Sequence, residues 1–222
     1  MKRALLALLI FCTPTPALCK NQGHYSYETI ERKSGAVSDH SHVRFDRSQP
    51  GVIRLEFERG LPDYPQKETY VFSEEYDTQT WKVENALTAT DYTGVKKNDR
   101  IVIKGRLNDE PVAKELSIDD KPFYAFPKFE LMPLASAKEG TSSEFWVLRR
   151  DSLDVYEMTA VNKGTTTIQL HGVPTRVVAI HWYPSNPLLR MFKRTYYYRL
   201  NDGLFVKQEY PDGRVRELVE ED

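Results

Sequence analysis

The residues best suited to bind a metal ion are histidines near the N-terminus. The stretch Asp39-His40-Ser41-His42 carries two of them, and His24 lies upstream. On a strand, residues two apart share a face, and a pair of imidazoles suits zinc or copper. However, the stretch follows Lys33-Ser34-Gly35, which indicates a loop entering a strand, and the spacing fixes no third ligand. We therefore expect no metal site.

Other residues offer little for acid-base or nucleophilic catalysis. His171 and His181 fall in predicted strands, where a histidine is more often a wall residue than a catalytic base. The acidic pairs Glu74-Glu75 and Asp119-Asp120 flank turns, and adjacent strand residues face opposite ways, so neither pair forms an acid-base dyad. The sequence contains no nucleophile elbow, phosphate-binding loop or dinucleotide fingerprint. We expect a protein that is not an enzyme and binds no cofactor.

The N-terminus has the order of features found in secretory signal peptides. Lys2 and Arg3 form a positive start, and Ala4 to Phe11 form an apolar run too short for a membrane anchor. Ala17-Leu18-Cys19 offers small residues at the positions that signal peptidase reads. Residues 1–19 are therefore predicted to be a cleaved signal peptide that exports the protein to the periplasm of a bacterium.

The remaining chain, residues 20–222, is predicted to be a single β-rich domain. Both cysteines, Cys12 and Cys19, belong to the leader, so the domain has no internal disulfide. A lipid anchor on Cys19 is not expected, because Leu18 precedes it where lipoprotein signals carry a small residue. Without the two leader cations the chain has 29 basic and 32 acidic residues. This balance disfavours a nucleic-acid partner, and no second apolar run is long enough to cross a membrane.

Alternation of apolar and polar residues dominates this domain and predicts half-buried strands. Between residues 52 and 59, Ile53, Leu55 and Phe57 share one face and charged residues share the other. Turn residues between such stretches predict antiparallel hairpins. The predicted strands and hairpins occupy residues 42–60, 68–85, 100–119, 144–151, 153–161, 165–172, 175–183 and 194–215.

Two apolar stretches interrupt the strands. Residues 121–140 are rich in proline, and Pro133 suits the first turn of a short helix that continues from Leu134 to Lys138. Residues 184–195 form the second interruption. An Asn-Lys-Gly turn at 162–164 is expected to separate two strands. The predicted fold is mainly β, a long antiparallel meander forming a curved sheet or half-open barrel around the short central helix.

Apolar and aromatic side chains in and beside these interruptions are the candidate ligand-binding residues. One interpretation is that they fill the core, because burying a large side chain stabilises a fold by roughly 1.5–3 kcal/mol without a ligand. The other is that they line a cavity for an acyl chain, with Met191 and Phe192 as a movable flap. The candidates are Phe123, Phe126, Phe129, Leu131, Leu134, Trp146, Trp182, Met191, Phe192, Tyr196 and Tyr198.

A resemblance to known proteins rests on the order of several short motifs. These are Thr80-Trp81-Lys82, Ile101-Val102-Ile103-Lys104-Gly105, Lys121-Pro122-Phe123, Phe145-Trp146-Val147-Leu148, and Tyr196-Tyr197-Tyr198-Arg199 followed by Asp202-Gly203. Their order is similar to that in an uncharacterised family of bacterial periplasmic β-rich proteins. The expected architecture resembles the half-open β-barrels of the lipoprotein carriers LolA and LolB. The motifs are structural, so the resemblance implies lipid binding only by analogy.

Two functions are expected on these grounds. The first is binding of an apolar or lipid-like ligand in the half-open barrel, with no chemistry. The second is a role as a cell-envelope interaction or assembly factor that has no small-molecule ligand and meets an envelope protein through strand edges or exposed aromatic residues. An internal cavity lined by the candidates would favour the first, and a filled core with an exposed apolar patch the second.

Overall fold

A computed structural model describes residues 22–31, 33–60 and 66–222. The expected signal peptide lies outside these residues. The described strands form one 15-stranded sheet in the order β8-β7-β6-β5-β4-β3-β2-β1-β15-β14-β13-β12-β11-β10-β9. The strands are β1 (Gln22–Ile30), β2 (Val37–Asp46), β3 (Ile53–Arg59), β4 (Gln66–Phe72), β5 (Thr78–Asn85), β6 (Thr90–Lys97), β7 (Arg100–Leu107), β8 (Glu110–Ser117), β9 (Phe123–Tyr124), β10 (Ser142–Arg149), β11 (Asp154–Leu170), β12 (Val173–Pro184), β13 (Arg194–Arg199), β14 (Phe205–Glu209) and β15 (Val215–Glu221).

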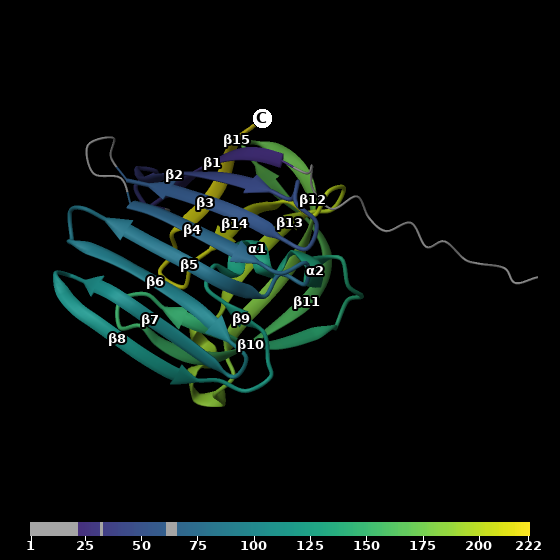
Figure 1. The fold of residues 1–222 in the computed structure, drawn as a ribbon. Coiled ribbons are helices and arrows are strands. Elements are labelled where there is room, and N and C mark those ends of the chain that lie inside the picture. Colours follow the sequence, from purple (N-terminus) through teal and green to yellow (C-terminus); the bar gives the residue numbers. More distant parts are fainter. Residues whose placement is uncertain (1–21, 32, 61–65) are drawn as a thin grey trace, which may run out of the picture.

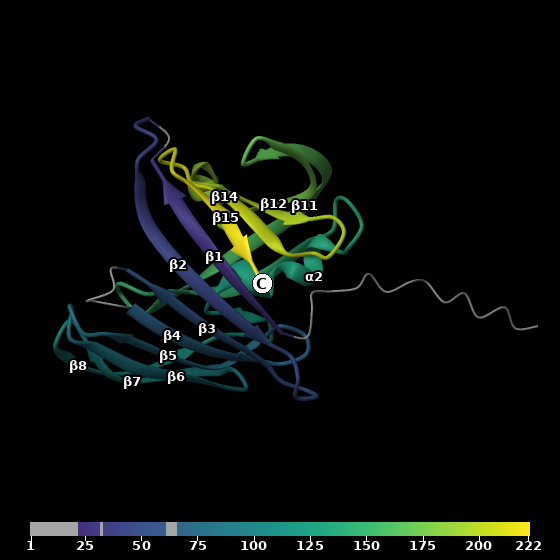
Figure 2. The ribbon, with the colours of Figure 1, turned by 90° about the horizontal axis from the view of Figure 1, so that it is seen from above.

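The sheet curls so that its first and last strands in sequence become neighbours. Strand β1 pairs antiparallel with both β2 and β15 (Figure 1). Figure 2 shows strands β3 to β8 on one side and β11, β12, β14 and β15 on the other, with α2 between them. The sheet does not close, because β8 and β9 are its two edges. Lys114 of β8 spans the gap, with Nζ 3.1 Å from the Asp154 carboxylate. The predicted curved antiparallel sheet around a central helix is confirmed.

Three short helices lie in the two interruptions. They are α1 (Pro127–Glu130), α2 (Met132–Ala135) and the 3-10 helix η1 (Pro187–Phe192). Pro133 lies in the first turn of a short helix as predicted, but this helix ends at Ala135 and not at Lys138. Each of the three has a proline in its first turn. The N–H that proline lacks would have no acceptor within the helix at this position, so no hydrogen bond is lost. Within the described chain, no helix is long and apolar enough to span a membrane.

The Glu130 carboxylate holds the central segment against the sheet. It accepts hydrogen bonds from the backbone N–H of Ala125 (3.2 Å) and Phe126 (2.7 Å), and from the hydroxyl of Thr78 on β5. The side chain is buried, and this burial raises the pKa of Glu130 well above its ordinary value although the three donors act in the opposite direction. One acidic group therefore organises the backbone just before α1 and fastens it to β5.

The turn predicted at residues 162–164 is wrong, because β11 continues through it as one 17-residue strand. A register shift between Asn162 and Thr165 takes up the extra residues, and Gly164 has a positive φ of 82°. The buried Asn162 side chain donates to the carbonyls of Leu134 (2.9 Å) and Ala137 (3.0 Å). This bulge thus fastens the end of α2 to the sheet from the other side.

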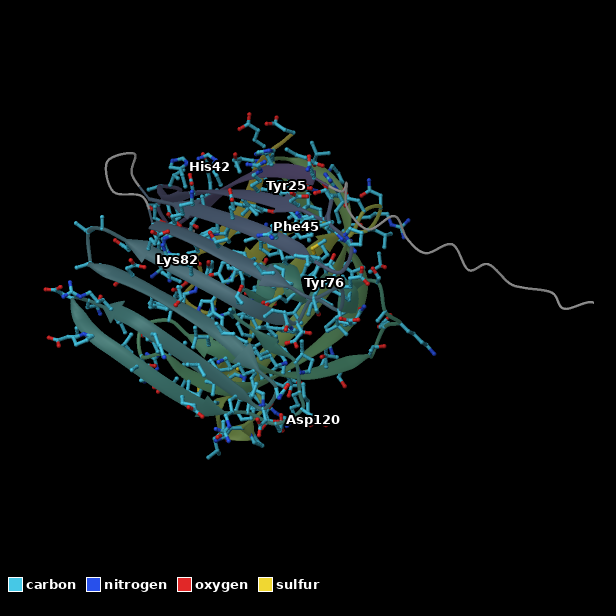
Figure 3. All side chains as sticks on the ribbon, in the orientation of Figure 1. Tyr25, His42, Phe45, Tyr76, Lys82 and Asp120 are labelled. Atoms are coloured by element: carbon cyan, nitrogen blue, oxygen red, sulfur yellow. The ribbon has the colours of Figure 1, made fainter. Side chains whose placement is uncertain are left out.

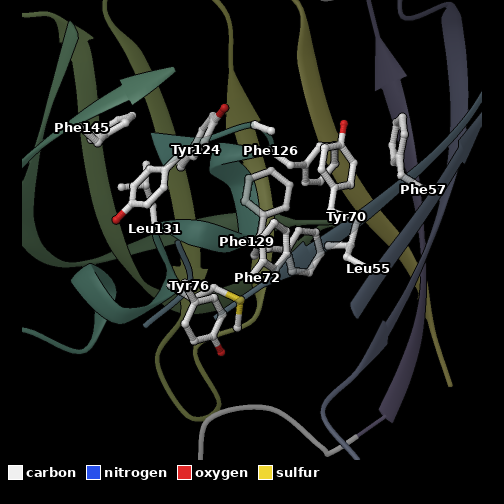
Figure 4. Packing of buried hydrophobic residues seen from close by; sticks show 14 of the residues in the cluster. Leu55, Phe57, Tyr70, Phe72, Tyr76, Tyr124, Phe126, Phe129, Leu131 and Phe145 are labelled. Atoms are coloured by element: carbon white, nitrogen blue, oxygen red, sulfur yellow. The ribbon is translucent and has the colours of Figure 1, made fainter. Parts of the chain in front are cut away.

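Aromatic rings fill the space between the sheet and the central segment. Phe126 packs against Phe57 and Tyr70, each with ring centroids 5.1 Å apart, and Phe129 packs against Phe45 at 5.8 Å (Figure 4). All five side chains are buried. The middle of the curved sheet is therefore a packed core.

The antiparallel register assigns every turn to one of two ends of this sheet. The end named here the Arg150 end has the turns at residues 86–89, 108–109, 150–153, 185–193 and 210–214. The opposite end, the Asp202 end, has those at residues 47–52, 73–77, 98–99, 171–172 and 200–204.

Replacing Glu130 by alanine tests its role as a fastener. We expect Glu130→Ala to lower the free energy of unfolding by about 2–4 kcal/mol, because it leaves buried donors without acceptors. The exposed Glu110→Ala is the control and should change it by less than about 0.5 kcal/mol. Urea unfolding followed by tryptophan fluorescence measures both. Equal effects of the two variants would show that Glu130 does not hold the segment.

Candidate functional site

The structure brings most of the predicted ligand-binding residues together inside the curved sheet, where they are buried. This group consists of Phe123, Phe126, Phe129, Leu131, Leu134, Trp182, Tyr196 and Tyr198. Their rings contact one another or other core rings, for example Trp182 and Tyr196 at 5.3 Å. They have the packing of core residues, and none of them lines the cavity at the Arg150 end described below.

Three of the predicted residues lie elsewhere. Trp146 is on the opposite face of β10 from the buried Phe145, and its indole N–H donates to Asp119 at 2.7 Å. Met191 and Phe192 project from η1, with 79% and 56% of their surface exposed. The structure thus separates the eleven residues into a core group, an outer-face tryptophan and an exposed loop.

Exposed apolar side chains are most frequent in the turns and strand ends of the Arg150 end. Ten large apolar residues of the described chain are exposed, and seven of them lie at this end. They are Val37, Leu87, Tyr156, Leu188, Leu189, Met191 and Phe192. The stretch from Pro184 to Thr195 that carries four of them has three cations and no acid. A loop with exposed apolar side chains and only positive charges suits contact with an apolar surface that is surrounded by negatively charged groups.

The inner face of the sheet changes from aromatic to charged toward the same end. Glu68 on β4 is fully buried and forms an ion pair with Arg150, whose side chain remains 33% exposed. Tyr70 donates its hydroxyl to Glu68, and an Arg150 N–H lies 2.8 Å from the same hydroxyl oxygen. A buried carboxylate needs such partners, because desolvating a lone charge is costly.

A second charged group lies on the neighbouring strands. The buried Arg216 of β15 donates to the Asp39 carboxylate (2.6 Å) and to the Thr29 hydroxyl (2.9 Å). Arg59, at the end of β3, lies 3.8 Å from the other oxygen of Asp39. Two guanidinium groups therefore share one carboxylate.

Lys128 projects from α1 toward these two groups. Its Nζ lies 4.8 Å from the ring centre of Phe126 and 5.7 Å from that of Phe57. Among the described residues it makes no hydrogen bond or ion pair, in contrast to the cations around it. Burial lowers the pKa of Lys128 well below its ordinary value, and the nearby Arg216 and Arg150 lower it further. The side chain is only half-buried by area.

A cavity of about 270 Å³ that is widely open to solvent lies at the Arg150 end. Arg59, Arg150 and Tyr92 line it together with Asp151, whose charge is balanced by Arg149 through contacts of 2.6 and 2.9 Å. The Tyr92 side chain is buried, and its hydroxyl has no hydrogen-bond partner in the described structure. Burial raises the pKa of Tyr92 to about 12. Two guanidinium groups thus line the cavity, and the Tyr92 hydroxyl lies buried behind its wall without a partner among the described residues.

The N-terminal histidines lie on the outer face. The stretch 39–42 is part of β2, so its assignment to a loop was wrong. His42, which is labelled in Figure 3, lines a pocket of about 390 Å³ together with His24 and several acids. Ser26 Oγ lies 3.0 Å from His42 Nδ1 and 3.4 Å from Glu220, so the acid contacts the serine and does not orient the histidine. Within the described residues, no group of three or more potential ligands is placed to bind a metal ion.

The other two histidines lie near opposite ends of β12. His171 is in the turn before this strand, so its prediction as a strand residue was wrong. A positive φ of 50° places His171 in the turn conformation. His181 is near the other end of the strand, and partial burial lowers its pKa. The two therefore form no common site.

The charged residues of the Arg150 end were missed in the sequence. A signal was present, because Arg59, Glu68 and Arg216 occupy positions that alternation assigns to the inward face. Lys128 and Arg150 gave no such signal, because a helix and a turn position them. Only the three-dimensional structure brings the five together.

Comparison with solved structures supports the fold. A β-barrel-like protein of a domain of unknown function, DUF1849, from Brucella abortus matches 93% of this chain and 99% of its own, with a TM-score of 0.59 and 12% identity. A DUF1089 family protein from Pseudomonas aeruginosa (77% and 89% covered, TM-score 0.43, 10% identity) and a hypothetical lipoprotein, YmcC, from Escherichia coli (88% and 84%, TM-score 0.39, 10% identity) are more distant. No family model and no curated relative matches the sequence. The first similarity confirms a β-barrel-like fold and extends to nothing further.

Removing the Arg150 charge tests the buried ion pair. We expect Arg150→Met to lower the free energy of unfolding by about 2–4 kcal/mol, because Glu68 would stay buried without its cation. The neighbouring Arg149→Met breaks an exposed pair and should leave the free energy of unfolding almost unchanged. The double variant Glu68→Gln/Arg150→Met should recover most of the loss. Urea unfolding measures all three, and equal effects of the two single variants would contradict the ion-pair role.

Proposed function

We propose that this protein binds a lipid-like amphiphile at the Arg150 end of its half-open barrel, without catalysing a reaction. The observation that carries the proposal is that the cavity and most exposed apolar side chains occur at the same end. The 270 Å³ cavity is small for a whole lipid, and the aromatic core leaves no room for a chain. The chain of the ligand would therefore lie along the exposed apolar residues of this rim.

The proposal includes export. The mature chain would be residues 20–222, released into the periplasm by cleavage of the leader and not anchored through Cys19. In that compartment the protein would meet membrane lipids. Lipid carriage by LolA and LolB is an analogy for such a role and no more than that.

A second candidate function is that of an envelope interaction factor that contacts another protein. The filled core favours it, because the exposed η1 loop could serve as a protein contact without any ligand. The edge strand β8 is a poor contact by strand addition, since it carries Pro111 and alternating charges such as Lys114 and Glu115. A photoreactive residue at position 192 distinguishes the candidates by forming a crosslink to lipid or to protein.

Charge in the η1 loop should abolish amphiphile binding. We expect Phe192→Asp to reduce lipid co-purifying with the exported protein at least about tenfold, because it removes apolar contact and adds negative charge. Val173→Asp is the matched control, since this valine is equally exposed at the opposite end, and should leave binding unchanged. Native mass spectrometry followed by denaturing extraction measures the bound lipid.

The proposal fails if the wild-type protein carries no amphiphile and also takes up none from phosphatidylglycerol vesicles. It fails equally if the two variants lose lipid to the same extent, because binding would then not be located at the Arg150 end.

A further inference from the structure

The inner face at the Arg150 end has more positive than negative charge. Four cations lie there with two carboxylates, Asp39 and Glu68. The cations are Arg59, Lys128, Arg150 and Arg216. Asp151 at the mouth adds no uncompensated charge, because Arg149 neutralises it from outside. A formal charge of +2 inside a partly desolvated space is unfavourable unless an anion offsets it.

Lys128 is the cation whose charge is least compensated. Both Lys128 and Arg150 lie near the Phe126 ring, with Nζ 4.8 Å and Cζ 5.5 Å from its centre. Arg150 has the Glu68 carboxylate as a counter-ion, whereas the described structure gives Lys128 two aromatic rings and no carboxylate. An ammonium with three donors and no acceptor is prepared to bind an oxyanion.

Unpartnered polar side chains occur in the same region. The side-chain oxygens of Ser41, Tyr92 and Gln208 are buried and form no hydrogen bond with described residues. Ser41 is paired in register with Arg59, and Gln208 with Arg216, so each is next to an arginine on the adjacent strand. Tyr92 lines the cavity itself. Buried polar groups normally have partners, and a cluster of exceptions indicates a place where a ligand supplies them.

We propose that this inner face binds the anionic head group, a carboxylate or a phosphate, of the amphiphile. The inference rests on the proposed function and adds to it the chemistry of the ligand. Lys128 and Arg150 bind the head-group oxygens, and the Tyr92 hydroxyl donates a hydrogen bond to them. The head group lies against Arg150, where the cavity borders the Phe126 ring that Lys128 also contacts, and the chain leaves across the exposed apolar rim.

Three probes separate the head group from the chain. Decanoate has both, 1-decanol has the same chain with a neutral end, and inorganic phosphate has only the anion. Titration calorimetry of the mature protein with each probe gives the affinities. We expect decanoate to bind at least about tenfold more tightly than 1-decanol, as charge-assisted hydrogen bonds would require.

Two variants test the assigned residues. Lys128→Met keeps the contact with the aromatic rings but removes the charge, and should bring the affinities for decanoate and 1-decanol within about twofold. Tyr92→Phe removes a hydroxyl without a partner, so it should fold as well as the wild type and weaken decanoate binding about threefold. The exposed Lys104→Met is the control and should change neither affinity.

Each outcome has a distinct meaning. Equal binding of decanoate and 1-decanol by the wild type, unchanged in Lys128→Met, would overturn the head-group site but leave amphiphile binding intact. Binding of phosphate alone, lost in Lys128→Met, would support an anion site and contradict the proposed function. Absence of binding for all three probes would overturn both.

Discussion

The fold depends on how one internal segment is held inside a curved sheet. A sheet of this length curls, and its concave face would be exposed unless something filled it. Residues 123–135 fill it, and buried side chains fix them from both sides. Glu130 binds the segment to β5, Asn162 binds its end to β11, and the Tyr198 hydroxyl donates to the Lys128 carbonyl at 3.0 Å. The same tethers fix where the Lys128 amino group lies, so the core and the candidate site have a common origin.

The interior has two parts with different physical properties. The central part is aromatic and closely packed, and close packing resists insertion of an acyl chain. The part at the Arg150 end is charged, incompletely paired and beside a cavity. This division explains why eight of the eleven apolar candidates have the packing of core residues while charged residues remain available for a ligand. It also explains why a ligand with a charged end suits this protein better than a purely apolar one.

The sequence predicted the strands well because alternation and turn residues are local signals. The hairpins around Ser48–Gly51 and Asn108–Asp109 are present as expected. The prediction of a turn at residues 162–164 failed. The Asn162 side chain donates a hydrogen bond to the Leu134 carbonyl of α2, and these residues form a β-bulge within one strand. The candidate site was harder to predict, because Lys128 and Arg150 approach each other only through the fold. The spacing of residues along the chain does not indicate such a contact.

The charge state of Lys128 is the most direct test of a head-group site at the Arg150 end. Carbon-13 NMR of labelled lysine side chains, assigned with the Lys128→Met variant, follows its titration. A head-group site at this end requires a Lys128 pKa well below the ordinary lysine value of about 10.4 in the free protein, because of burial and the nearby guanidinium groups, and an increase of this pKa when decanoate is added. A Lys128 that titrates at the ordinary value and does not respond to decanoate would contradict it.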